Sequence, residues 1–259
     1  MKLPNLEGMR SYDNHTRKVL AKLCDLAYND KHDLDIKIEY FGKQTDVEFL
    51  GLNTDDQVFL VFRGTEYSGV NASLNDIKTN IDFCWHDFDS EFPEYGQVHQ
   101  GFLIAFNKSI KEILSFINKH KGKKINLIGH SLGGAFATIA AAYICHHERL
   151  KGNYVNSVWT FGMPRVGDRK FRNFYNDKLA LEERTKRIVY DDDAATKVPP
   201  WLLGYRHIGQ EIWINKNGKV FEKGLPWYKS LFNKFSLNAL WDDARKDHDI
   251  ENYYLIGGQ

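Results

Sequence analysis

The chain contains little of what marks several large classes of protein. Its 259 residues include only three cysteines, whose spacing matches neither a metal site nor a disulfide framework. No run of about 18 apolar residues occurs, so we expect no membrane-spanning helix, and the N-terminal stretch lacks the apolar segment of a signal peptide. We therefore expect a cytoplasmic location by default, and secretion stays open in case a leader has been removed.

An excess of charge of either sign is also missing. The 35 Lys and Arg residues nearly balance the 34 Asp and Glu residues, and no basic stripe alternates with aromatic residues. This composition has no electrostatic footprint for nucleic acid, so we expect no nucleic-acid partner. We likewise expect no cofactor and no metal ion, and the oligomeric state stays open.

The hydrophobic patterns that are present are those of an α/β protein. With 42% hydrophobic residues the chain can build a substantial core, and we expect a single domain over residues 1–259. Three strand patterns in succession predict an antiparallel start of the sheet. Strand and helix patterns then alternate, which predicts a mostly parallel central sheet flanked by helices. The predicted strands are 36–41, 47–52, 57–62, 124–129, 155–161 and 186–190, with a closing hairpin at 211–222; the predicted helices are 16–29, 101–120, the Ala-rich stretch 135–142 and 168–180.

The stretch Ile125–Tyr143 places a serine between a buried strand pattern and the Ala-rich helix pattern. Gly129, Ser131 and Gly133 form a Gly-x-Ser-x-Gly motif, in which the glycines leave room for a sharp turn that exposes the serine hydroxyl. Such a turn also aims N–H groups of the helix N-terminus, that of Leu132 in particular, at a negative charge forming beside the serine. The pattern predicts a nucleophilic serine; the alternative is a glycine-rich turn with Ser131 as a helix N-cap.

A nucleophilic serine requires a histidine base and a carboxylate that orients the base, in the chain order serine, acid, histidine. The predicted strand 186–190 opens into the three aspartates 191–193, only one of which can be the acid, and a solvated turn is the alternative. Among the later histidines we favour His248 as the base, because it lies in a loop-like stretch after all the predicted strands. We expect His207 to be a structural hydrogen-bonding residue. His130, inside the serine motif, is expected to point away from the serine and to serve packing.

Six separated segments together resemble the class 3 lipases, the α/β-hydrolases that include the fungal triacylglycerol lipases. They are GHSLGG, VFRGT, VHQGF, TFGMPRVGD, DAATKVPP and GYRHIG, and they follow the order of the family over about residues 50–255. The resemblance implies an α/β-hydrolase fold and a catalytic triad of Ser131, Asp193 and His248. It also implies that Thr65 and Leu132 supply the donors of an oxyanion hole.

Together these features predict a serine carboxylic-ester hydrolase that acts on lipid esters through an acyl-enzyme. Trp201, Leu202 and Leu203 are candidates for the wall of an acyl groove, with an ordinary apolar cover for a loop as the alternative. Two other functions stay open. One is an esterase for soluble or aromatic acyl groups, as in the feruloyl esterases that resemble the same family. The other is a non-catalytic binding protein on a lipase-like fold.

The segment Glu66–Phe83 follows the predicted oxyanion residue, where related lipases carry a helical lid. Its apolar residues Val70, Leu74, Ile77 and Ile81 recur at helical intervals and predict one narrow apolar stripe. The stripe fits a lid over the substrate groove, with Leu74 against the substrate, and it equally fits a surface helix packed on the core. The segment has no tryptophan, so we expect only weak contact with a lipid interface.

Overall fold

An eight-stranded sheet organises the protein. The computed structural model describes residues 3–6, 12–29, 37–43, 45, 47–64, 83–148, 152–222 and 246–256. In spatial order the strands of the sheet are β1 (Ile38–Phe41), β2 (Phe49–Asn53), β3 (Gln57–Phe62), β6 (Lys124–His130), β7 (Tyr154–Phe161), β8 (Thr185–Tyr190), β9 (Gln210–Ile214) and β10 (Val220–Phe221). The five strands from β3 to β9 in this order are parallel, and the strands at both edges are antiparallel. The antiparallel start and the closing hairpin agree with the sequence patterns.

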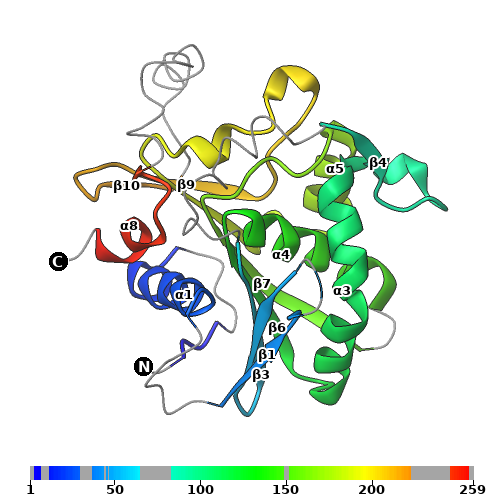
Figure 1. The fold of residues 1–259 in the computed structure, drawn as a ribbon, viewed down its shortest axis with the longest axis horizontal. Coiled ribbons are helices and arrows are strands. Elements are labelled where there is room, and N and C mark those ends of the chain that lie inside the picture. The colour runs from blue at the N-terminus through cyan, green and yellow to red at the C-terminus, as the bar shows by residue number, and fades with distance from the viewer. Residues whose placement is uncertain are drawn as a thin grey trace.

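Helices cover both faces of the sheet (Figure 1). Alternate residues of β3 divide the core, because Val58, Leu60 and Phe62 face one layer while Phe59 and Val61 face the other. The first layer contains α3 (Gln100–Lys119), α4 (Leu132–Tyr143) and α5 (Arg169–Asn173); the second contains α1 (Asn14–Leu26) and α8 (Ile250–Leu255). None of the helices in the described ranges combines the length and the apolar character that crossing a bilayer requires.

The helix α4 is hydrophobic on all sides because it is enclosed by the core. Its residues from Gly133 to Ala142 are all buried, and its small alanine side chains let it lie close to β6 and β7. Beyond Tyr143 the helix widens into one π-helical stretch, Ile144–Glu148. The helix therefore begins at the Ser131 turn and ends in the π-helical stretch.

A second, two-stranded sheet lies beside the main one and has no counterpart among the predicted elements. It pairs β4 (Trp85–Asp87) with β5 (Gln97–His99) across a turn that includes the 3₁₀ helix η1 (Pro93–Tyr95). Strands of three residues are too short to show a hydrophobic period. They are held instead by distant residues: the Trp85 ring stacks on Tyr205 with centroids 3.8 Å apart, and the His99 N–H donates to the Val166 carbonyl at 2.9 Å.

Candidate active site

Ser131 occupies the turn between β6 and α4 in a strained backbone conformation. Its φ of 55° and ψ of −129° lie in a region that non-glycine residues rarely adopt, and such strain is typical of functional turns. The turn requires close backbone approach on both sides: a β-carbon on Gly129 would lie 2.2 Å from the Gly133 carbonyl oxygen, and one on Gly133 would lie 2.2 Å from the Phe62 carbonyl oxygen. The Ser131 N–H donates to the Phe161 carbonyl at 2.8 Å. The expected sharp strand-to-helix turn is therefore present.

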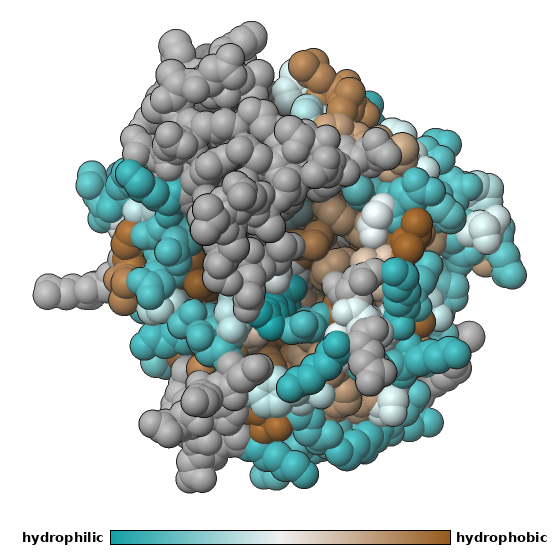
Figure 2. Space-filling model, in the orientation of Figure 1, coloured by the Kyte–Doolittle hydropathy of each residue, from teal (hydrophilic) through white to brown (hydrophobic). Residues whose placement is uncertain are grey.

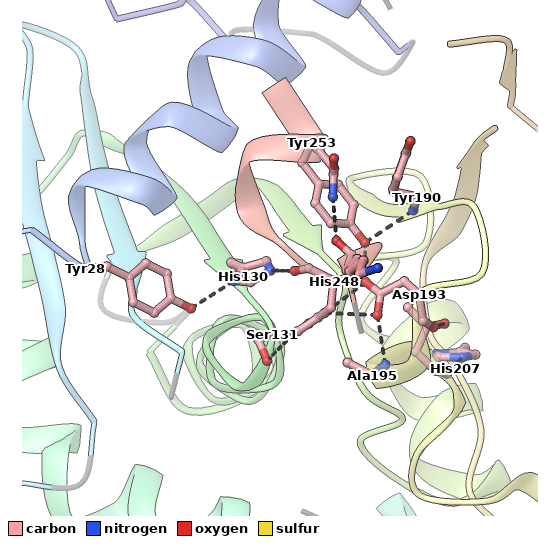
Figure 3. Close-up of polar contacts among 12 residues, drawn as sticks. Tyr28, His130, Ser131, Tyr190, Asp193, Ala195, His207, His248 and Tyr253 are labelled. Carbon is pink, nitrogen blue, oxygen red and sulfur yellow. Dashed lines mark hydrogen bonds and ion pairs between the residues drawn. The ribbon is translucent and has the colours of Figure 1, made fainter. Parts of the chain in front are cut away.

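His248 lies against the Ser131 hydroxyl, just before α8 (Figure 3). Its Nε2 is 2.8 Å from Ser131 Oγ, and its Nδ1 is 3.0 Å from each carboxylate oxygen of Asp193. All three side chains are buried. With a proton on Nδ1, the ring donates to Asp193 and offers the Nε2 lone pair to the serine hydroxyl, which is the arrangement that permits proton transfer from serine.

Asp193 is completely buried and multiply hydrogen-bonded. Besides His248, it accepts from the Ala195 N–H at 2.8 Å and from the Tyr253 hydroxyl. Burial opposes ionisation of the carboxyl, but the charge of His248 and the hydrogen bonds outweigh it, so the pKa of Asp193 lies below its ordinary value. Burial, aided by the charge of Asp193, raises the pKa of the Tyr253 hydroxyl, which therefore remains a donor.

The other two aspartates of the triplet face lysines at the surface. Asp192 pairs with Lys197 at 2.6 Å, and Asp191 lies 3.6 Å from Lys216. The tertiary structure thus separates three residues that the local sequence leaves equivalent. Only Asp193 of the three contacts a histidine in the described part of the chain.

His130 differs from the sequence expectation that it only fills space. Its Nε2 lies 2.9 Å from the His248 carbonyl oxygen, its Nδ1 lies 2.9 Å from the Tyr28 hydroxyl, and its ring stacks on that of His248 with centroids 4.6 Å apart. Burial, with the nearby His248, lowers the pKa of His130 to about 3, so the ring is neutral. His130 therefore holds both the backbone and the ring of His248. A motif position cannot reveal this contact, because its partner lies at the other end of the chain.

His207 has the structural role expected for it. It is half-buried, and its Nε2 lies 2.9 Å from the Thr196 carbonyl oxygen in the loop that follows Asp193. Burial first, and then the charges of Arg187 and Arg165, lower the pKa of His207 well below its ordinary value. This neutral ring is fixed to a backbone carbonyl of the loop that follows Asp193, and it does not contact the serine (Figure 3).

Of the two predicted oxyanion donors, the structure describes one. Leu132 is the first residue of α4, where helix N–H groups lack partners within the helix. Thr65, Leu74 and residues 66–82 of the predicted lid segment lie outside the described residues. The residue before Thr65 does lie beside the serine: a β-carbon on Gly64 would be 3.0 Å from Ser131 Cβ, and the Gly64 N–H donates to the Tyr28 hydroxyl at 3.1 Å.

The predicted groove residues form an apolar projection. Trp201, Leu202 and Leu203 make the 3₁₀ helix η6 and are 45%, 77% and 48% exposed. In Figure 2 a hydrophobic projection stands at the top of the molecule, where Figure 1 shows the loop that carries this helix. Such exposure of three adjacent large apolar side chains is typical of an interaction site.

Side chains spaced as metal ligands lie away from Ser131. Within the described ranges, the group with this spacing is Asp89, His146 and His147, at the other end of α4. The Ser131 site itself is made of a serine, an imidazole and a carboxylate that bond to one another.

The parallel sheet, the strained serine turn and the Ser–His–Asp arrangement are those of the α/β-hydrolase class. Comparison with known proteins identifies the family within this class, because the family model for class 3 lipases matches residues 59–203. The chain belongs to the class 3 lipase family.

Individual relatives of the chain are named as lipases. The chain is 36% identical over 122 residues to a secreted mono- and diacylglycerol lipase of Fusarium solani, covering 46% of this chain and 34% of that protein. It is 28% identical over 183 residues to a secreted mono- and diacylglycerol lipase of Malassezia globosa, covering 67% of this chain and 57% of that protein. The matched region thus spans between a third and three fifths of the length of these curated relatives.

Solved lipase structures share the fold. Lipase II from Rhizopus niveus superimposes with a TM-score of 0.66 at 26% identity, covering 83% of this chain and 88% of that one. Lip2 lipase from Yarrowia lipolytica gives a TM-score of 0.68 at 21% identity, covering 94% of each chain. The α/β-hydrolase fold expected from the sequence is confirmed.

Proposed function

We propose that the protein is a serine carboxylic-ester hydrolase that acts on lipid esters, with Ser131 as nucleophile, His248 as general base and Asp193 as the acid that orients the base. The observation that carries the proposal is the 2.8 Å contact between His248 Nε2 and Ser131 Oγ, made while Nδ1 of the same ring faces the buried Asp193. A serine acting only as an N-cap needs no such pair of contacts. The Ser131 side chain makes no capping hydrogen bond to α4.

The geometry supports a two-stage reaction. In the first stage Ser131 Oγ attacks the ester carbonyl while His248 Nε2 takes the hydroxyl proton, and the same proton then passes to the departing alcohol as the acyl-enzyme forms. In the second stage water attacks the acyl-enzyme, gives a proton to His248 and releases the carboxylic acid, and the proton returns to Ser131. We expect the negative oxygen of each tetrahedral intermediate to accept from the Leu132 N–H at the start of α4 and, as the resemblance to the class 3 lipases implies, from Thr65. Loss of one such donor costs about 2.7 to 4 kcal/mol of transition-state stabilisation.

Two observations favour lipid esters as substrates. The relatives named above are lipases for mono- and diacylglycerols. The exposed Trp201, Leu202 and Leu203 provide an apolar surface for an acyl chain or for weak contact with a lipid interface.

Replacing Leu202 by Ser should lower hydrolysis of an acylglycerol emulsion several-fold and leave hydrolysis of a short soluble ester unchanged. Equal loss on both substrates would assign Leu202 to folding and not to lipid contact.

A fluorophosphonate probe tests the nucleophile directly. The folded protein should be labelled at Ser131, and Ser131→Ala should be neither labelled nor active while its circular dichroism and melting temperature stay close to those of the wild type. Failure to label the folded wild type would favour the non-catalytic binding protein instead.

A substrate panel then separates the two catalytic alternatives. Acylglycerols should be hydrolysed faster than p-nitrophenyl acetate and feruloyl esters if lipid is the substrate. Preference for the feruloyl esters would favour the soluble-ester esterase.

The names of the relatives bear on the location of the protein. Both relatives described above are named as secreted proteins, so they give no support to a cytoplasmic default, and we infer that the protein acts outside the cell.

We also infer one domain over residues 1–259, because α1 near the start packs against α8 near the end, and both lie on the same sheet face. A single cooperative unfolding transition monitored by two probes would support this inference, and two separate transitions would contradict it.

A further inference from the structure

The far end of α4 brings two histidines and an aspartate together. His146 and His147 are consecutive residues of the π-helical stretch Ile144–Glu148, and Asp89 lies in the turn after β4. At 1.5 Å per residue, the length of α4 separates this group from Ser131 by roughly 20 Å. Figure 1 agrees, because β4 lies on the right of the molecule and α8, which follows His248, lies on the left. The group is therefore distinct from the candidate active site.

The two distances from Asp89 to the histidine nitrogens are close to the spacing of metal ligands. Asp89 Oδ2 lies 3.5 Å from His146 Nε2 and 3.3 Å from His147 Nε2, and the three ligand atoms all lie within 4.8 Å of one another. Zinc–ligand bonds of about 2.0 to 2.1 Å at tetrahedral angles place neighbouring ligand atoms about 3.3 to 3.4 Å apart. A direct hydrogen bond between these groups would be shorter, near 2.7 to 3.0 Å. The spacing fits an ion between the groups better than direct bonds.

The three side chains are held in place before any ion binds. Asp89 Oδ1 accepts the Glu91 N–H at 2.9 Å, which directs Oδ2 toward the histidines. The His146 ring stands edge-on to Tyr95 with centroids 4.9 Å apart, and the His147 ring packs against Tyr143 at 4.4 Å. A hydrogen-bonded ligand carboxylate and fixed imidazoles are the usual support of metal sites in proteins.

Charge and access also suit a cation. Glu91 and Glu148 lie close enough to His147 to act on its charge, and the His147 side chain is 35% exposed, so an ion and a water ligand can reach it from solvent.

We propose that Asp89, His146 and His147 bind one divalent transition-metal ion of the zinc type, with solvent at the fourth position. Two imidazoles and one carboxylate are ligands that zinc prefers, whereas Mg²⁺ and Ca²⁺ prefer oxygen ligands throughout. The ion joins the turn after β4 to the end of α4, two segments distant in sequence. Its effect is therefore stabilisation of the fold, independent of ester hydrolysis. It also departs from the sequence expectation of no metal ion.

Zinc titration of the metal-free full chain tests the site. Isothermal titration calorimetry should give one zinc per chain, and the melting temperature should rise by roughly 5 to 10 °C at a zinc concentration about 100 times Kd. Mg²⁺ at the same concentration should leave the melting temperature unchanged. Co²⁺ should give the visible absorption of a site with nitrogen and oxygen ligands.

Matched variants locate the bound ion. His146→Ala and His147→Gln should lose the thermal shift, and Asp89→Asn, which keeps an oxygen for the Glu91 N–H, should raise the Kd at least tenfold. His86→Ala is the control: His86 is an exposed histidine of β4 outside the group, and its replacement should keep the full shift. A shift of the same size in all three ligand variants, or the absence of zinc binding to the wild type, would overturn the proposal. The first result would place the zinc elsewhere, for example on His248, and the second would leave a surface ion pair only.

Discussion

Two carboxylates face imidazole rings at opposite ends of α4, and their surroundings differ. Asp193 is fully buried, and both of its oxygens accept hydrogen bonds, from His248, Ala195 and Tyr253. Asp89 is partly exposed; its Oδ1 accepts a backbone N–H, while its Oδ2 lies beyond ordinary hydrogen-bond length from two rings. The same pair of chemical groups is thus used in two ways.

The comparison shows how burial and hydrogen bonding select the chemistry. A carboxylate with every oxygen bonded fixes a single ring in one orientation, which a proton-transfer site needs. A carboxylate that faces two rings across a gap leaves space for an ion. Residue types alone therefore do not distinguish the two sites, and the number of hydrogen bonds to each carboxylate does.

The largest expected effect is the loss of kcat when the charge of Asp193 is removed, with the same change at Asp89 as the comparison. Asp193→Asn should lower kcat by about 10⁴-fold, by analogy with the same change in a serine protease, because the histidine takes the wrong tautomer. Asp89→Asn should leave kcat within about twofold, as expected for a surface change away from the chemistry. Steady-state hydrolysis of a p-nitrophenyl ester measures both, with Asp191→Asn and Asp192→Asn as mild controls. A large loss at Asp192 would move the acid by one residue.

The next effect concerns the tyrosine that donates to Asp193. Tyr253→Phe should lower the free energy of unfolding by roughly 1.5 to 3 kcal/mol, because a buried carboxylate loses a charged hydrogen bond. Tyr254→Phe is the matched control, since the adjacent hydroxyl donates to the partly exposed Asp25 at 3.3 Å and should contribute less than about 1 kcal/mol. Urea unfolding at pH 7 compares the two. Equal losses would mean that burial of Asp193 adds nothing to the strength of its bond.

A pH effect of intermediate size is expected from His130 and His207, because burial lowers the pKa of each ring. Below about pH 6.5 a histidine in the unfolded chain binds a proton, whereas His130, with its pKa lowered to about 3 mainly by burial, does not. The unfolded state then holds more protons, so the stability present above pH 6.5 is lost as the pH falls toward the folded pKa. The loss is about 1.4 kcal/mol per pH unit for each such histidine.

Urea unfolding between pH 8 and pH 4.5 measures this slope. His207→Gln should reduce it by about the contribution of one histidine, because burial also lowers the pKa of His207. Between pH 7 and 8 the wild type and the variant should differ by a constant amount. A slope that is identical in both proteins below pH 6 would show that His207 is protonated in the folded state.

The smallest effect is expected at the exposed group in the absence of metal. His147→Gln should change the free energy of unfolding of the metal-free protein by less than about 0.5 kcal/mol, because exposed ion pairs and surface substitutions contribute little. Thermal unfolding in the presence of a chelator measures this change. A loss of several kcal/mol without metal would make His147 a structural residue and would remove the contrast between the two carboxylates.

Much of the fold follows from the sequence because its signals are local. The apolar run before Ser131, the alanines after it and the spaced apolar residues of α3 each act within one element. The strands and helices predicted within the described residues are present. The sharp turn at Ser131 is equally local, since Gly129 and Gly133 make room for the same few backbone atoms. The β4–β5 sheet was missed because its short strands depend on Tyr205 and Val166, far along the chain.

What the sequence by itself determined is the order of strands and helices, the glycine turn at Ser131 and a short range of candidates for its partners. Only the tertiary structure placed Asp193 in the core and left Asp191 and Asp192 beside lysines. It also brought His130 against His248. At the far end of α4 it brought Asp89 close to His146 and His147. The physical reason is the range of the interactions. Propensity and hydrophobic period act over a few residues, whereas burial of a charge and convergence of ligands depend on which distant segments the folded sheet brings together.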